Sequence, residues 1–100
     1  MKTTLVEENN TLVMKLEGRL DTAASPLVEK DMQPLLKDKD HDVILDCTAL
    51  EYISSSGLRL FLTVLKGVKS NQHHVYIKGI SDDIRNVFAM TGFINLFEFK

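Results

Sequence analysis

Three consecutive serines, Ser54, Ser55 and Ser56, form the densest group of hydroxyl side chains in the sequence, and Gly57 follows them directly. They stand between an apolar stretch and an amphipathic segment over residues 58–68. A serine at the start of a helix can accept a hydrogen bond from a free amide of the first turn, which accounts for one of the three. A serine hydroxyl can also be phosphorylated or attack a substrate, so capping, phosphorylation and catalysis are the three chemistries to weigh.

Phosphorylation suits a serine at this place for physical reasons. The first turn of a helix presents N–H groups without partners and the positive end of the helix dipole, so it accommodates a phosphate without unfolding. The phosphate adds about 1.5 to 2 negative charges at neutral pH and would repel an apolar or acidic partner surface. The residue types alone favour capping and phosphorylation equally, because serine-rich turns before helices are common.

A serine hydrolase is the catalytic alternative. Its nucleophile often stands in the pattern Gly-x-Ser-x-Gly, but Ile53 occupies the place of the first glycine before Ser55. No acidic residue lies between Ser55 and His73, so the order serine, acid, histidine cannot form with His73 or His74. The sequence therefore disfavours an enzyme.

Phosphoaspartate and metal chemistry are also disfavoured. Asp46 ends an apolar run, and Glu7-Glu8 resembles the acidic pair of a phosphoaspartate receiver, but the next residues alternate as a strand where a receiver has a helix. His73 and His74 enter a strand, where adjacent side chains point to opposite faces and do not readily chelate one ion. No metal site is predicted.

The chain opens with a predicted β-hairpin. Residues 3–8 and 11–17 are rich in β-forming residues, and Asn9-Asn10 between them tolerates the positive φ angles of a tight turn. Gly18 is expected to end the second strand.

Two signals predict how the next helix begins and bends. Ser25-Pro26 combines an N-cap residue with a proline at the first helical position. Pro34 lies inside the same apolar stripe and removes a backbone donor, so the helix should kink or restart there.

After residue 40 the pattern alternates between strands and helices. The continuous apolar run 43–45 predicts a central strand covered on both faces. Helical spacing over 58–68 and 81–88 predicts two helices, and 75–77 and 96–99 predict two further strands. The predicted fold is α/β, with a mixed sheet in which right-handed parallel crossovers follow an antiparallel hairpin.

Composition limits the class of protein. A chain of 100 residues, 44% hydrophobic and 26% charged, predicts one globular domain over 1–100. Twelve basic and fourteen acidic residues, spread along the chain, argue against direct binding of nucleic acid. No export signal or membrane-inserting segment is evident, and the single Cys47 predicts a small buried hydrophobic residue and excludes an intramolecular disulfide. The sequence therefore predicts a cytoplasmic protein.

Four segments in order along the chain match the motifs of one known family. They are Gly18-Arg19-Leu20-Asp21, Val43-Ile44-Leu45-Asp46, Ile53-Ser54-Ser55-Ser56-Gly57-Leu58 and Phe88-Ala89-Met90-Thr91-Gly92-Phe93. Together they resemble the STAS domains of bacterial anti-sigma factor antagonists, and the resemblance covers nearly the whole chain. The serine segment is similar to that family's phosphorylation loop, Met-Asp-Ser-Ser-Gly-Leu.

The resemblance implies a STAS-like mixed sheet with helices packed on it, and it implies a set of site residues. In that family the phosphorylated serine stands two residues before the glycine, which implies Ser55, with Ser54 and Ser56 as alternatives. Asp21 follows Gly18 in a loop that we expect to be exposed. The implied partner-binding residues are Asp21, Ser54, Ser56, Gly57 and Arg59.

The function implied by the resemblance is partner switching. The unphosphorylated protein would bind an anti-sigma factor that is also a serine kinase, and the sigma factor would be released. The kinase would then phosphorylate Ser55, and a serine phosphatase would restore the active form. On this interpretation the domain is a ligand and a substrate, with no catalytic residue and no cofactor.

A further alternative keeps the fold and changes the role. Stand-alone STAS domains also serve as regulatory subunits of transport or signalling complexes. The family often has an aspartate immediately before the phosphorylated serine, whereas this chain has Ser54, which lowers the local negative charge.

Overall fold

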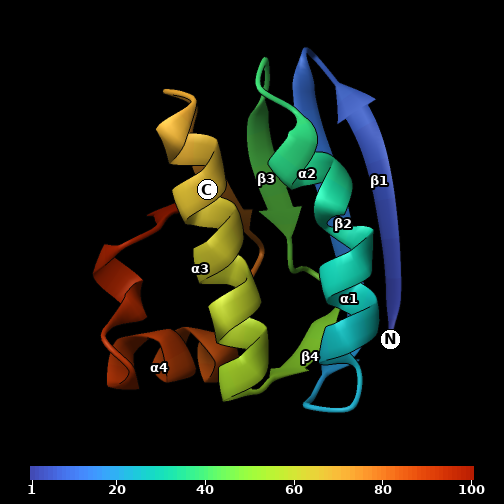
Figure 1. Cartoon of the computed structure of the whole chain (residues 1–100). Helices are drawn as coiled ribbons and strands as arrows, with labels where there is room; N and C mark the ends of the chain where they lie inside the picture. The colour runs from blue at the N-terminus through green and yellow to red at the C-terminus, as the bar shows by residue number, and fades with distance from the viewer.

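The first two strands of the computed structural model, which describes residues 1–100, form the predicted hairpin (Figure 1). β1 (Lys2–Glu8) pairs antiparallel with β2 (Thr11–Leu20). Asn9 and Asn10 between them have φ angles of 51° and 63°. Positive φ at both central residues is what a two-residue hairpin turn of type I′ requires, so the sequence prediction is confirmed.

Gly18 does not end β2, and the prediction that it would is wrong. Gly18 has a φ of 102°, the register shifts between Gly18 and Arg19, and the strand continues to Leu20. The irregularity bends the strand away from β3 (Asp42–Asp46), with which its first half pairs. The last residues of β2 pair instead with β4 (Leu50–Ile53), a strand that the sequence analysis did not predict.

The remaining strands run parallel to β2. The order across the sheet is β1-β2-β3-β5-β6, with β4 beside the end of β2. β5 is Val75–Lys78, and the last strand, β6, covers only Glu98–Phe99. The predicted strand over 96–99 is thus shorter, because the chain first forms a 3-10 helix, η1 (Phe93–Asn95).

The predicted helices are present, and their observed bounds differ from the predicted ones by one to three residues. α1 (Ser25–Asp31) is followed directly by α2 (Gln33–Lys37), whose first turn contains Pro34, so the predicted restart is confirmed. Ser25 is the first helical residue, whereas it was predicted to be the N-cap, which is Ala24. The other helices are α3 (Ser55–Ser70) and α4 (Asp82–Met90).

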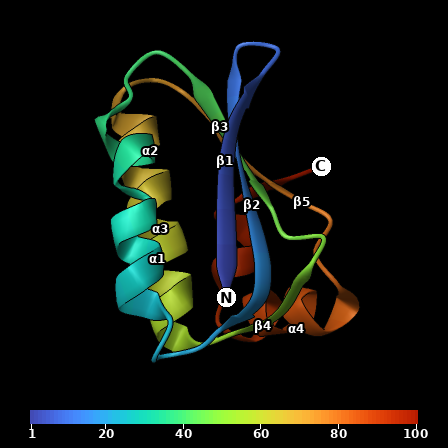
Figure 2. The same ribbon diagram turned by 90° about the vertical axis from the view of Figure 1, so that its right-hand side faces the viewer.

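The helices α1, α2 and α3 lie together against one face of the sheet (Figure 2). Val43 and Leu45 point to that face and are fully buried, whereas Ile44 on the opposite face is only partly buried. The prediction that this strand is covered on both faces is therefore wrong. α4 contacts β4 at one end of the sheet. None of the helices combines the length and apolar content needed to cross a membrane.

Aromatic contacts join the C-terminal part of the chain to α3. The Phe88 ring of α4 lies 6.2 Å from Phe61 of α3 and 5.7 Å from Phe97, measured between ring centroids. All three side chains are buried, and such tilted arrangements are favourable for aromatic rings. This cluster fixes α4 and the chain end on the same core as α3.

The start of α3 lies close to β2 and β4 because Gly57 has no side chain. A Cβ atom at Gly57 would lie 2.8 Å from Leu20 Cγ and 2.9 Å from Ile53 Cγ1. Both neighbours are buried core residues whose branch atoms cannot move away easily. Gly57 thus lets the first turn of α3 pack against the ends of both strands.

Gly57→Ala should destabilise the protein although alanine is the better helix former. Overpacking a core contact costs about 1 to 3 kcal/mol, which exceeds the helix-propensity gain of about 1 kcal/mol. Gly67→Ala is the matched control in the same helix, because its Cβ would meet only the end of the Leu36 side chain. Urea unfolding should show a loss for Gly57→Ala and none for Gly67→Ala, and equal stabilities would contradict the packing argument.

Candidate functional site

Ser54 caps helix α3. Its backbone has an extended conformation, and its Oγ accepts a hydrogen bond of 3.2 Å from the Gly57 N–H. Its own N–H donates to the Leu20 carbonyl at 2.8 Å, which holds the cap against the end of β2. Only 8% of Ser54 is exposed. One of the three serines is therefore explained by capping.

Ser56 links this cap to helix α1 through a chain of hydroxyls. The Ser56 Oγ lies 2.9 Å from Ser54 Oγ and 2.9 Å from Ser25 Oγ. Ser25 donates its proton to the Asp21 carbonyl at 2.9 Å. Because each hydroxyl has one proton, Ser56 must donate to Ser25, and Ser54 must donate to Ser56. The hydrogen bonds therefore run in one direction from the Gly57 N–H to the Asp21 carbonyl.

The chain of hydroxyls is built into the interior of the site. Ser25 and Ser54 are the only two buried polar residues of the protein, and both belong to it. Buried polar groups are stabilised when each has its hydrogen-bond partners, as here. The protons of Ser54 and Ser56 are engaged within the protein, so neither hydroxyl is free to react without breaking the chain.

Ser55 differs from its two neighbours in both exposure and hydrogen bonding. It is the first residue of α3, its side chain is exposed, and its hydroxyl makes no hydrogen bond with another residue. Its position suits phosphorylation, because a negative group in the first turn of a helix interacts favourably with the helix dipole. Of the three serines, only Ser55 has an exposed hydroxyl that makes no hydrogen bond within the protein.

Asp21 is half-buried and hydrogen-bonded, contrary to the expectation of an exposed loop residue. Its Oδ1 accepts from the Ala24 N–H at 2.9 Å, and its carbonyl accepts from the Ser25 N–H at 3.1 Å. Ala24, the N-cap of α1, has no side-chain group that could accept a hydrogen bond, and the Asp21 carboxylate accepts one in its place. No local sequence pattern indicated this substitution. Asp21 therefore helps to start α1 beside the serine turn.

Arg59 lies one turn after Ser55 on an exposed part of α3. Every ion pair in the structure involves a histidine, so the Arg59 guanidinium has no carboxylate partner. It lines a groove of about 240 Å³ between α1 and α3, which also includes Glu29 and Ser56. The structure thus brings Arg59 into the same groove as Ser25 and Ser56.

Sequence reasoning did not identify an exposed aromatic group beside the serines. The Arg19 guanidinium lies 4.5 Å from the centre of the Tyr52 ring, and Tyr52 is 40% exposed. Next to it, a groove of about 600 Å³ lies between β1 and α1 and includes Leu27, which is 68% exposed. Arg19 and Tyr52 come together only through the pairing of β2 with β4, which no local pattern indicated.

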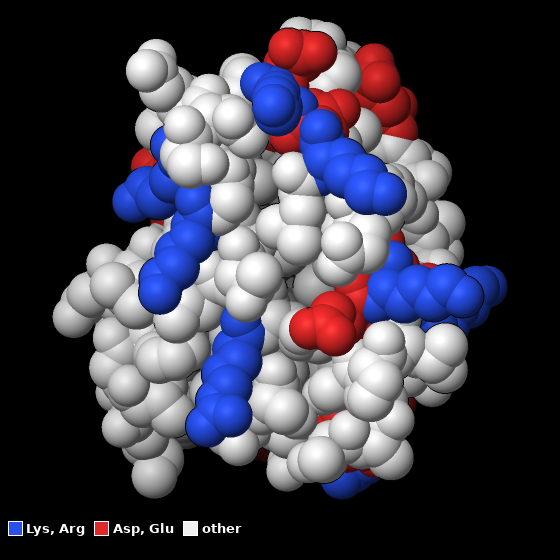
Figure 3. Space-filling model, in the orientation of Figure 1, with Lys and Arg blue, Asp and Glu red and all other residues white.

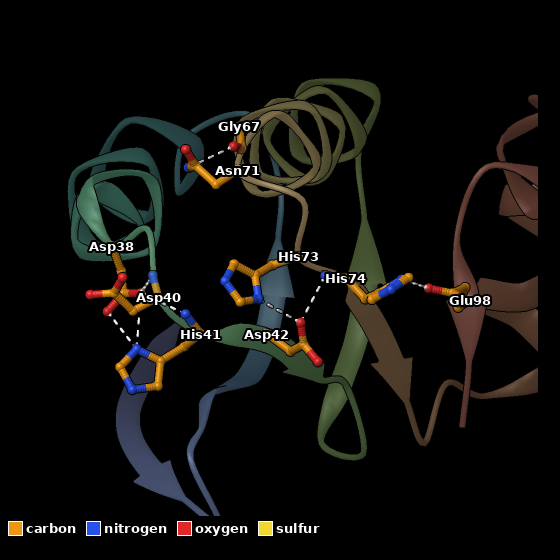
Figure 4. A network of polar contacts seen from close by, with 9 residues as sticks. All are labelled: Asp38, Asp40, His41, Asp42, Gly67, Asn71, His73, His74 and Glu98. Atoms are coloured by element: carbon orange, nitrogen blue, oxygen red, sulfur yellow. Dashed lines mark hydrogen bonds and ion pairs between the residues drawn. The ribbon is translucent and has the colours of Figure 1, made fainter.

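The three histidines lie at the opposite end of the sheet from the serines. His41 Nδ1 lies 2.9 Å from the Asp38 carboxylate, and Glu7 Oε1 is 3.6 Å from its Nε2. The His73 imidazole lies 3.0 Å from Asp42, and the His74 imidazole lies 3.0 Å from Glu98 in the last strand. Figure 4 shows both contacts, together with the hydrogen bond from the His74 N–H to Asp42. Each imidazole has its own acidic partner.

Cys47 and Asp46 both have structural roles. Cys47 is fully buried, and this burial raises the pKa of its thiol to about 12, so it is a small core residue as predicted. Asp46 accepts hydrogen bonds from the Thr48 hydroxyl and N–H. It shapes the turn before β4 and makes no contact with the serine chain.

A model of the STAS domain matches residues 2–100. This protein belongs to the STAS domain family. Among curated proteins, the anti-sigma-B factor antagonist of Staphylococcus aureus is 34% identical over 83 residues, which are 83% of this chain and 77% of that relative.

Solved structures confirm the STAS fold. An anti-sigma factor antagonist from Mycobacterium paratuberculosis superimposes with a TM-score of 0.88 at 17% identity, covering 98% of this chain and 83% of that protein. The Bacillus cell fate determinant SpoIIAA, in its phosphorylated form, superimposes with a TM-score of 0.74 at 20% identity, covering 99% and 91% of the two chains. The predicted mixed sheet with an N-terminal hairpin is therefore the fold of this family.

Alanine substitutions should separate the structural serine from the free one. Ser54→Ala removes the α3 cap and interrupts the hydroxyl chain, so it should lower the free energy of unfolding by about 0.5 to 2 kcal/mol. Ser55→Ala removes no hydrogen bond and should change it by less than about 0.5 kcal/mol. Thermal unfolding of the two variants measures the difference, and the reverse order would show that Ser55 is the capping residue.

Asp38→Asn should change the titration of His41 in this STAS domain. The hydrogen bond to the Asp38 carboxylate raises the pKa of His41 above its ordinary value of 6.5, and that bond lowers the pKa of Asp38 below 3.8. Stabilisation through His41 is complete below the ordinary imidazole pKa and is lost as pH rises through the raised one. Stabilisation through Asp38 is lost as pH falls through its lowered pKa.

The stability advantage of wild type over Asp38→Asn should therefore be largest between about pH 5 and 6 and smaller in alkaline solution. Proton NMR should show the pKa of His41 lower in the variant. A His41 pKa that is identical in both proteins would refute the assigned cause.

Proposed function

We propose that this STAS domain is an anti-sigma factor antagonist whose partner binding is controlled by phosphorylation of Ser55. The observation that carries the proposal is the division among the serines, because Ser55 is exposed and free while Ser54 and Ser56 are hydrogen-bonded. The S. aureus relative is named an anti-sigma-B factor antagonist, and one solved relative of the same fold is phosphorylated. Both findings support this function.

The proposed cycle uses a serine kinase that is also the anti-sigma factor. The Ser55 Oγ forms a bond to the γ-phosphorus of ATP, the bond between that phosphorus and the bridging oxygen breaks, ADP leaves, and the hydroxyl proton is released. A serine phosphatase restores the hydroxyl by hydrolysing the phosphate ester. The cycle takes place in the cytoplasm, and this protein contacts neither nucleic acid nor membrane.

The phosphate acts on the partner rather than on the fold. Ser55 belongs to no hydrogen-bonded network, and its neighbours are held by the chain from Gly57 to Asp21. Adding about 1.5 to 2 negative charges therefore changes the surface without breaking a contact beneath it. The proposed partner surface surrounds Ser55 and comprises Asp21, Ser56 and Arg59. Ser54 and Gly57, which the sequence also implied as partner-binding residues, are buried and support this surface from beneath.

A catalytic role for Ser55 has no geometric support. A nucleophilic serine needs a base such as histidine within hydrogen-bond distance. Ile53, just before the serines, pairs with Leu20 at the end of β2, whereas Asp42, beside the histidines, pairs with Thr11 at its start. At about 3.3 Å per residue the two ends of β2 are about 30 Å apart.

Binding of the purified anti-sigma factor kinase to Ser55 variants tests the proposal. Ser55→Asp should bind more weakly than wild type, because it places a negative charge on the partner surface. Ser55→Ala should bind as wild type does and should resist phosphorylation. Ser70→Asp is a control, since it adds the same charge at the exposed far end of α3.

Calorimetric titration measures the affinity of each variant for the kinase, and circular dichroism checks that each variant keeps its fold. Weak binding of Ser55→Asp alone, with an unchanged spectrum, supports the switch. The aspartate carries one charge where the phosphate carries nearly two, so a partial loss is expected. Equal affinities of wild type and both Ser55 variants would refute control by phosphorylation at this residue.

A further inference from the structure

We infer that Arg59 pairs with the phosphate on Ser55, so that phosphorylation both adds a negative group to the partner surface and withdraws the cation nearest to it. The inference rests on the proposed phosphorylation of Ser55. It assigns to Arg59 two states, free in the unmodified protein and paired within α3 in the phosphorylated one.

The helix places the two side chains together. Ser55 and Arg59 are four residues apart in α3, and at this spacing Cβ atoms on a helix surface are about 5 to 6 Å apart. Long helical side chains point back toward the N-terminus, so the Arg59 guanidinium extends toward the first turn. Its place in the groove with Ser25 and Ser56 agrees with that direction. An acidic group four residues before a basic one is also the favourable order.

The charges around Arg59 leave it available for the phosphate. Helix α3 contains three basic residues and no Asp or Glu. Figure 3 shows basic side chains spaced along α3, with much of the acid of this face lying toward α1 and α2. The nearby acidic group across the groove is Glu29, which shares the groove lining but does not pair with Arg59. A phosphate has more charge than this carboxylate and three oxygens for the guanidinium fork.

Pairing changes what a partner meets at this surface. Before phosphorylation the Ser55–Arg59 turn carries one exposed positive charge. Afterwards it carries a net charge of about −0.5 to −1, and the guanidinium donors are directed to the phosphate. A partner that places an acidic group at Arg59 would therefore lose an attractive contact and meet a repulsive one.

The pairing can be measured without any kinase. Protein with phosphoserine incorporated at position 55 during synthesis would be titrated by phosphorus NMR as wild type, Arg59→Gln, Arg59→Lys and Lys66→Gln. Arg59→Gln should raise the second pKa of the phosphate by a few tenths of a unit, because a nearby cation favours the dianion. Lys66→Gln removes the same charge about two turns further along α3 and should leave this pKa unchanged. Arg59→Lys should lie between wild type and Arg59→Gln.

The same phosphate pKa in wild type and Arg59→Gln would overturn the pairing, whether or not Ser55 is phosphorylated in the cell. The other informative result is a phosphate pKa that is lower in wild type than in Arg59→Gln, combined with the absence of phosphate on Ser55 in protein from the native cell. It would refute the proposed function and leave the pairing intact.

A second measurement tests the consequence for binding. Arg59→Gln should weaken the affinity of the anti-sigma factor kinase for the unphosphorylated protein more than for the phosphorylated one, because Arg59 is already engaged by the phosphate in the latter. The ratio of the two affinities should fall relative to wild type and to Lys66→Gln. An equal loss in both states would show that Arg59 contacts the partner regardless of the phosphate, and would overturn the inferred withdrawal.

Discussion

The site depends on one chain of hydrogen bonds that joins the first turns of two helices. It passes from the Gly57 N–H through Ser54, Ser56 and Ser25 to the Asp21 carbonyl, and its direction is determined by the single proton of each hydroxyl. Because two of these serines are buried, the chain cannot be exchanged freely for water. The starts of α1 and α3 therefore form one rigid surface.

This chain of hydrogen bonds gives the adjacent serines different roles. Ser54 and Ser56 hold the surface together, and Ser55 between them is left exposed. It also gives a reason for serine rather than aspartate at position 54, since an ionised carboxylate could still accept from the Gly57 N–H but could not donate to Ser56. A modification at Ser55 can then alter binding while the scaffold beneath it stays unchanged.

Local sequence patterns predicted the helices, strands and turns better than the long-range contacts between them. The Asn9-Asn10 turn and the restart at Pro34 depend on backbone preferences of a few residues, and both were predicted correctly. The pairing of β4 with β2 and the bond between Ser25 and Ser56, 31 residues apart, depend on long-range packing. Neither leaves a periodic signal, so the sequence pointed to the serine turn without showing which hydroxyls were already engaged.

Site-specific phosphate mapping tests whether Ser55 is the residue that is phosphorylated. Protein purified from its native cell, with and without phosphatase treatment, would be measured as intact mass and then as peptides covering residues 54–56. We expect one phosphatase-sensitive phosphate, located on Ser55. A phosphate located on Ser54 or Ser56 would contradict it, because those hydroxyls would then not be held within the protein as the hydrogen bonds require.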